Sequence, residues 1–262
     1  MSMFTEALEI FHDQESYFRK INETREPGKV IRSQTLIIFA FTFAYGVVMG
    51  SYHSLLQSVV AGAKLFLLFT VALLVCFPSF FIVQLILGSK IKLDRMLIII
   101  MSGLLFTSAI MLAFAPIVVF FQLTGDNYHF LQLLHVGIFV FSGFFGMRLV
   151  VEALKYACEK ANIYPKIGVT IFRIWVIILA FVGIQLAWNM RPFLGSEGMP
   201  FELFRSSTKG NFYSTMLHAV GQMMGVDQKP RTRDNRQGQL NYTPSDSLER
   251  MLLTPLQEEH TP

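Results

Sequence analysis

The sequence predicts an all-α protein: a polytopic membrane helical bundle with about five transmembrane helices, an amphipathic N-terminal helix and a disordered C-terminal tail. Of the 262 residues, 53% are hydrophobic and only 15% are charged. A soluble domain of this length carries roughly a quarter charged residues and lacks apolar runs near twenty residues. Here such runs recur, and each can cross the ~30 Å hydrocarbon core of a bilayer. The same observations divide the chain into residues 1–33, 34–190, 191–226 and 227–262.

The N-terminal part, residues 1–33, has the pattern of an amphipathic helix. Its large apolar side chains fall near one helical face, and its acidic side chains fall elsewhere. The apolar residues are Phe4, Leu8, Phe11, Phe18 and Ile21. Such a helix can pack on the bundle or contact a partner or a lipid surface, and packing is the preferred interpretation. Pro27 and Gly28 are expected to end it.

Five apolar runs are the predicted transmembrane helices. They cover residues 36–52, 65–88, 96–123, 130–147 and 169–190. Thirteen Lys and Arg residues precede the first span, separate the second from the third, or border the connection from the fourth to the fifth, whereas the opposite connections contain Lys64 alone. Because cytoplasmic loops carry an excess of Lys and Arg, we expect a cytoplasmic N-terminus and an external C-terminus.

Two features inside the spans bear on helix packing. Pro78 and Pro116 remove a backbone donor and tend to kink a helix, either as a hinge or cavity lining or as a static kink, which is the preferred interpretation. Gly46 and Gly50 form a small-xxx-small pattern that permits close helix approach. Packing within the chain is preferred over dimerisation.

Catalytic and transport chemistry is sparse in the predicted spans. None contains Asp, Glu or Lys, and the one Arg is Arg173 near a border. Coupled transporters place ionisable residues inside the bundle, and intramembrane hydrolases need a nucleophile or an activated water with its base. The spans also lack HExxH and the glycine-rich phosphate loops. We therefore expect no enzymatic activity, no cofactor and no metal.

The remaining polar residues, which include histidines, amides and hydroxyls, are interpreted as structural. His53, Asp126, His129 and His135 are types that bind zinc or move protons, but no spacing signature links them, so they are interpreted as polar interface residues. Buried amides and hydroxyls are expected to join helices. They include Gln84, Gln185, Asn189, Thr42, Thr70, Ser102, Thr107 and Ser108.

The WNMRPF segment after the last span supplies the candidate interface residues. They are Trp188, Arg191, Phe193, Phe201 and Phe204. Aromatic rings and an arginine suit the membrane border, so this segment is interpreted first as an anchor that fixes the depth of the span. The other interpretation is a docking platform for a partner.

The net charge and the cysteines bear on two further possibilities, a nucleic-acid partner and a disulfide. The net charge is +4 and the sequence pI is about 9.1, but the basic residues flank apolar spans, so no nucleic-acid partner is expected. Cys76 lies in a span and Cys158 in a polar connection. They are therefore interpreted as packing residues rather than a disulfide.

A resemblance to an uncharacterised family of bacterial multispan proteins is carried by KLFLLFTVALLVCFPSFFIVQLILGSKIKLDRMLIIIMSGLLFTSAIMLAFAPIVVFF, together with QLAWNMRPFLG and PFELFR. It covers roughly residues 30–215. In span number and hydropathy this family is similar in outline to Yip1-type membrane domains, although the DLYGP-type stretch of the eukaryotic proteins is absent. The resemblance implies a multispan topology in the bacterial cytoplasmic (inner) membrane and a non-enzymatic role.

The expected function is that of a non-enzymatic scaffold or assembly partner in a membrane complex. Its partners are the lipid bilayer and another membrane protein or a second copy of the chain. The alternative is a passive channel or lipid-handling transporter, in which the kinks at Pro78 and Pro116 open a path. A continuous polar cavity between the second, third and fifth spans would favour the alternative, and a dry core would favour the scaffold.

Overall fold

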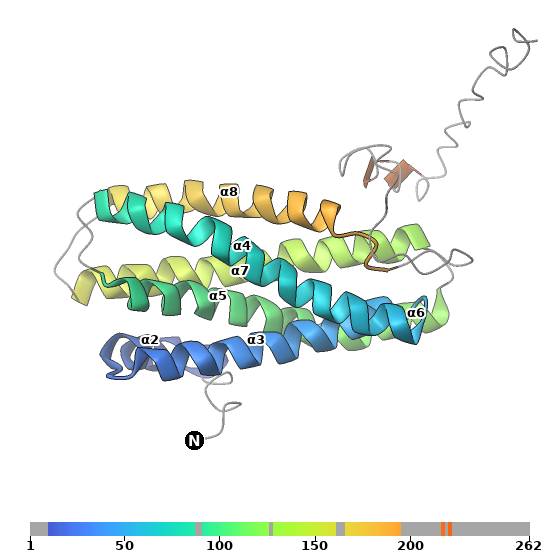
Figure 1. Ribbon diagram of the computed structural model, residues 1–262, viewed down its shortest axis with the longest axis horizontal. Helices are drawn as coiled ribbons and strands as arrows, with labels where there is room; N and C mark the ends of the chain where they lie inside the picture. The colour runs from blue at the N-terminus through green and yellow to red at the C-terminus, as the bar shows by residue number, and fades with distance from the viewer. Residues whose placement is uncertain are drawn as a thin grey trace, which may run out of the picture. The chain divides into compact units, whose positions relative to one another are not determined.

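The computed structural model describes residues 10–86, 91–125, 128–160 and 166–194, together with residues 216–217 and 220–221. Its regular elements are helices (Figure 1). They are α2 (Gln14–Glu23), α3 (Pro27–Gly50), α4 (Leu55–Ile86), α5 (Leu93–Ala113), α6 (Ala115–Thr124), α7 (Tyr128–Lys160) and α8 (Lys166–Asn189). The chain divides into two units, Met1–Met224 and Gly225–Pro262. Every described residue belongs to the first unit, so the predicted tail lies outside the described residues.

Most of these helices have the length and composition of membrane spans. Four stretches are long and apolar enough to cross one: Pro27–Gly50, Leu55–Ile86, Leu93–Thr124 and Tyr128–Glu159. The fifth apolar helix is α8, in which Ile174–Asn189 is a shorter apolar stretch. Large apolar side chains are exposed on several of these helices, as a lipid-facing surface requires. They include Leu74, Ile86, Phe144 and Ile177. The predicted helical membrane bundle is confirmed.

The five longest helices contact one another in a closed ring. Around it, α3 packs on α4, α4 on α8, α8 on α7, α7 on α5, and α5 on α3. In Figure 1, α8 lies on one side of α5 and α7 and α3 lies on the other, while α4 runs obliquely from beside α8 to beside α3. The side chains of α5 are buried along most of its length. We call the end of the bundle where α3 meets α4 the Leu55 end and the opposite one the Asp94 end.

The close approach of α3 and α4 depends on glycine. A Cβ on Gly46 would lie 2.6 Å from the Cα of Gly62, and one on Gly50 would lie 2.6 Å from the carbonyl oxygen of Gln57. Both neighbours are backbone atoms, which cannot turn aside as a flexible side chain can. The small-xxx-small pattern therefore serves packing within the chain.

The two prolines predicted inside spans, Pro78 and Pro116, lie at different places in their helices. Pro116 lies in the first turn of α6 and divides the predicted third span into α5 and α6, since proline suits the first turn of a helix. Pro78 remains inside α4. Close to it, the carbonyl oxygen of Cys76 accepts the indole N–H of Trp175 in α8 at 3.0 Å and the hydroxyl of Ser79 at 2.8 Å. Helix α4 thus continues through Pro78, and a hydrogen bond from α8 reaches it two residues before the proline.

Several helices extend beyond the predicted spans. Helix α4 begins at Leu55 rather than at residue 65, and α7 continues to Lys160 rather than ending at residue 147. The sequence between residues 55 and 64, LLQSVVAGAK, interrupts its apolar residues with Gln57, Ser58 and Lys64, and these polar side chains are buried. Lys64 consequently lies inside α4. The expectation that no span contains a lysine was wrong.

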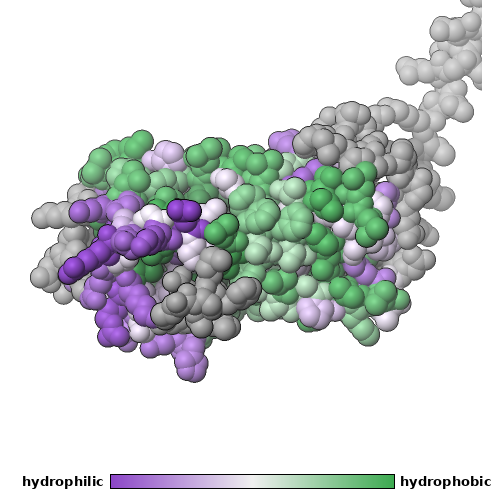
Figure 2. All heavy atoms as spheres, turned by 60° about the horizontal axis from the view of Figure 1, so that its bottom comes forward, coloured by the Kyte–Doolittle hydropathy of each residue, from purple (hydrophilic) through white to green (hydrophobic). Residues whose placement is uncertain are grey.

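The amphipathic N-terminal helix packs on the bundle. Helix α2 begins at Asp13, whose carboxylate accepts the backbone N–H of Ser16 at 3.0 Å, and it contacts α5 and α7. Its buried residues are Tyr17, Phe18 and Ile21. It ends at Glu23, whereas Pro27 opens α3 instead of only terminating α2. In Figure 2, hydrophilic residues gather at the end of the bundle that α2 covers, and hydrophobic residues dominate beyond it.

Candidate functional site

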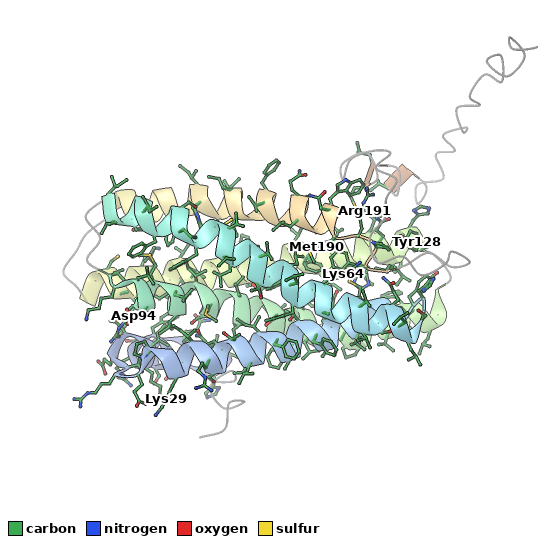
Figure 3. The ribbon with its side chains drawn as sticks, in the orientation of Figure 1. Lys29, Lys64, Asp94, Tyr128, Met190 and Arg191 are labelled. Carbon is green, nitrogen blue, oxygen red and sulfur yellow. The ribbon has the colours of Figure 1, made fainter. Side chains whose placement is uncertain are left out.

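The segment that follows α8 is held against α4 by two polar side chains. Gln57 Nε2 donates to the carbonyl oxygens of Pro192 and Phe193, both at 3.1 Å. Lys64 Nζ donates to the Pro192 oxygen at 3.1 Å and lies 5.9 Å from the centroid of the Phe193 ring. Gln57 and Lys64 are seven residues apart and so share one face of α4. Figure 3 shows Lys64 and Met190 close together near the end of α8.

Two of the predicted interface residues, Arg191 and Phe193, belong to this segment, and a third, Trp188, lies at the end of α8. The Arg191 guanidinium stacks on Trp188, 3.0 Å from the ring centroid, and its Nε donates to the Trp188 carbonyl at 3.1 Å. Phe193 packs against the core, and the neighbouring Leu194 is buried with Met49 and Leu131. The segment thus turns back onto the bundle. The other two predicted residues, Phe201 and Phe204, lie outside the described residues.

A second polar cluster joins α2, α3 and α5. Gln34 Nε2 lies 2.8 Å from both Tyr17 Oη and Ser102 Oγ, and these two oxygens lie 2.9 Å apart. All three residues are buried. Next to the cluster, Arg95 donates from Nη1 to the Ile21 carbonyl at 3.0 Å and from Nη2 to the Thr24 carbonyl at 2.8 Å. These bonds satisfy carbonyls at the C-terminal end of α2, which have no partner within the helix.

A third polar pair lies between α3 and α7. Tyr45 Oη is 2.8 Å from His135 Nδ1, and both residues are buried. The other ring nitrogen of His135, Nε2, has no hydrogen-bond partner in the described structure. Because this nitrogen is either a donor or an acceptor, its burial among apolar neighbours carries a desolvation penalty.

The remaining predicted polar residues are spread rather than gathered. His135 pairs with Tyr45, His53 lies beside Ser54, and Asp126 is outside the described residues. Within the part of the chain that the structure describes, no three His, Cys, Asp or Glu residues are placed to share a metal ion. Most of the predicted hydroxyls bond to a carbonyl of their own helix instead of joining helices. These are Thr42, Thr70, Thr107 and Ser108.

Two hollows lined by described residues lie at opposite ends of the bundle. At the Asp94 end, a cavity of about 10 Å³ is enclosed by α2, α5 and α7 around Arg95. At the Leu55 end, an open groove of about 460 Å³ lies between the α3–α4 turn and α6, beside Tyr52 and Gln122. Neither hollow lies between α4, α5 and α8, where a path through the second, third and fifth spans was considered.

Chemically, several of the described polar residues form hydrogen-bond links between elements. They are Gln34, Tyr45, Gln57, Lys64, Arg95 and Trp175. Sequence reasoning missed Gln57, Lys64, Trp175 and Tyr45 as members of these links. The spacing of Gln57 and Lys64 was a usable signal, because a helix that continued through them would place both on one face. No local signal indicated the partners, which lie far away in the sequence. Lys64 and Pro192, for example, are separated by 128 positions.

The fold and these links define the class of protein: a helical membrane bundle to which α2 and the segment after α8 are attached by hydrogen bonds. Comparison with protein-family models, with curated proteins and with solved structures finds no match. The membrane location therefore rests on the chain's own apolar helices.

Proposed function

We propose that this chain is a non-enzymatic scaffold or assembly partner in a membrane complex. The observation that carries the proposal is the fixed placement of α2, whose apolar face is buried while its charged face is exposed. Tyr17 and Ile21 are buried, and the Arg95 guanidinium bonds the carbonyls at the C-terminal end of the helix. A rigid amphipathic helix held in this way can present its outer face to a protein partner without a large loss of conformational entropy.

The exposed face of α2 carries charges of both signs. They are Glu15, Arg19, Lys20 and Glu23. A mixed pattern of this kind suits a complementary protein surface better than an anionic lipid surface, which favours Lys and Arg alone. The partner that fits is a polar protein surface, either a soluble domain or the exposed part of another membrane protein.

Affinity purification in mild detergent tests the proposal. The wild-type chain is compared with a variant in which Glu15→Lys, Arg19→Glu and Lys20→Glu reverse the exposed face. A matched control carries Arg148→Glu and Glu152→Lys, which reverse an exposed ion pair on α7. We expect one or more proteins to copurify with the wild type and the control and to be lost with the α2 variant. Identical recovery from all three would contradict a role for this face.

The alternative function, a passive channel or a lipid-handling transporter, requires a continuous path through the bundle. Proteoliposomes containing the purified protein test it directly, by release of a small encapsulated dye and by exposure of a labelled lipid on the opposite leaflet. We expect neither process to exceed the rate in protein-free vesicles. An increase in either would replace the scaffold proposal with the alternative.

We further propose that the protein lies in the bacterial cytoplasmic (inner) membrane with a cytoplasmic N-terminus and an external C-terminus. The support is the bias of Lys and Arg toward the Asp94 end. The turn at the Leu55 end, residues 51–54, contains no Lys or Arg. The resemblance to a family of bacterial multispan proteins, with its Yip1-like outline, stays a prediction that agrees with this placement.

A further inference from the structure

Helix α8 ends short of its neighbours at the Leu55 end. Figure 1 shows its ribbon stopping before the ends of α4, α6 and α7. Hydrogen bonds fix the level at which this happens, because the Pro192 carbonyl bonds to both Gln57 and Lys64 and so lies beside that stretch of α4. At 1.5 Å per residue, the middle of this stretch is about 8 Å inward from Leu55 along α4.

The end of α8 has the composition of a membrane border. Asn189 is exposed, and Arg191 stacks on the Trp188 ring while bonding its carbonyl oxygen. Trp and Arg concentrate where hydrocarbon gives way to headgroups, since each combines an apolar body with a polar or charged group. By this criterion, the border beside α8 lies near residues 188–191.

The neighbouring helix tips, which extend further outward, have the opposite character. Leu55 at the start of α4 is 89% exposed, and Leu123 near the end of α6 is 82% exposed. The two tips are at similar levels because Gln122 Nε2 donates to the carbonyl of Val48, just before the α3–α4 turn, at 2.9 Å. Large aliphatic side chains exposed in this way favour surrounding hydrocarbon over water.

We infer that the membrane border steps inward beside α8. Phospholipid headgroups and water reach Asn189 and Arg191, while hydrocarbon still covers Leu55 and Leu123 further out along the bundle. A bilayer thins locally around a span whose apolar length is short, so the step needs no polar channel through the protein. The step brings headgroups to the side of the bundle where Lys64 holds the chain after α8. This inward step of the membrane border, where lipid headgroups contact the side of the bundle, is independent of the proposed scaffold function.

Electron paramagnetic resonance of nitroxide labels tests the inference in vesicles of phosphatidylcholine and phosphatidylglycerol. Single labels are placed through Asn189→Cys, Leu55→Cys and Leu123→Cys, all at exposed positions. Ile177→Cys, exposed on α8, gives the hydrocarbon reference, and Lys29→Cys gives the aqueous reference. The native Cys76 and Cys158 are buried, so the unsubstituted chain reports any background labelling.

The readout is the ratio of accessibility to a water-soluble nickel chelate and to oxygen, which dissolves in hydrocarbon. At position 189 we expect the ratio to approach that at position 29, and at positions 55 and 123 to approach that at position 177. Low ratios at all three positions would place the border at the helix tips. High ratios at all three would place it at the level of α8 around the whole bundle. Either uniform result would overturn the inference of a step.

Discussion

Several polar side chains in this bundle link elements by donating to backbone carbonyl oxygens of another element. Lys64 bonds a carbonyl of the irregular segment after α8, and Trp175 bonds the carbonyl of Cys76 near the α4 proline. Where a carbonyl oxygen is buried between helices, a protein donor replaces the water that would otherwise bond it. A substitution at one of these residues therefore removes a bond and leaves its buried partner without that donor.

The Tyr45–His135 pair provides a test at this scale. Tyr45→Phe removes the hydroxyl that bonds His135 Nδ1, so both ring nitrogens of this buried histidine are left without a hydrogen-bond partner. We expect a loss of about 0.5–1.5 kcal/mol in the free energy of unfolding in bicelles, the range of hydrogen bonds within membranes. His135→Leu should cost a similar amount or less.

The double variant Tyr45→Phe/His135→Leu separates the bond from the packing. Because each single substitution leaves a polar partner unpaired, we expect the double variant to be more stable than the sum of the two single losses predicts. Strict additivity of the three measured values would show that the 2.8 Å contact does not contribute to stability.

At the scale of elements, helix contacts depend on close backbone approach at some positions and on capping at others. Helices α3 and α4 meet through glycines, whereas α2 is fixed by its buried aromatic residues and by Arg95. The two kinds of contact are therefore expected to be disrupted by different substitutions. A side chain added between α3 and α4 forces the helices apart, while loss of the Arg95 guanidinium frees one end of α2.

Gly46→Ala tests the contact between α3 and α4. The added methyl would meet backbone atoms of Ala61 and Gly62 within 2.8 Å, so we expect a loss of about 1–3 kcal/mol in the free energy of unfolding, as in other overpacked cores. Gly137→Ala in α7 is the matched control, because no atom lies within 4 Å of a Cβ there. Equal stability of the two variants would mean that the helices separate without penalty.

Arg95→Gln tests the attachment of α2. Two charge-assisted bonds to the helix end are lost, and such bonds contribute about 1.5–3 kcal/mol each. We expect trypsin to cut after Arg25, in the linker between α2 and α3, several times faster in the variant. Arg148→Gln, which removes an exposed pair with Glu152, should leave the rate of cleavage unchanged. An unchanged rate in Arg95→Gln would assign the attachment of α2 to its apolar face alone.

At the scale of the whole molecule, the ring of α3, α4, α8, α7 and α5 fixes which connections share a side of the membrane. Helix ends at the Asp94 end carry the basic residues of the connections, and the two short connections at the Leu55 end carry none. This asymmetry predicts orientation through the positive-inside rule.

Reporter fusions test this orientation. Fusions after Lys92 and Lys160 should report a cytoplasmic location, and fusions after Asn127 and at the C-terminus an external one. Reversal of all four signals would invert the bundle. A cytoplasmic C-terminus alone would mean that the chain crosses the membrane again after Leu194.

The sequence by itself determined the class of the fold and two of the residues that α2 buries, Phe18 and Ile21, whereas Phe11, expected on the same face, is 49% exposed. Transfer of apolar side chains into lipid adds up along a continuous run, and amphipathic periodicity is a local pattern, so both can be found without tertiary information. The packing role of Gly46 was predicted for the same reason, since the chemistry of one residue suffices.

Only the tertiary structure decided which polar groups meet and where the helices end. Lys64 was assigned to a connection, just before the apolar run that begins at Leu65, yet α4 continues through it, and Gln57 and Lys64 are buried against a segment more than a hundred positions away. Tyr45 and His135 are separated by 90 positions, and Arg95 and Ile21 by 74. Such pairs follow from the way helices pack, which depends on the fit of whole surfaces and leaves no periodic signal in either partner.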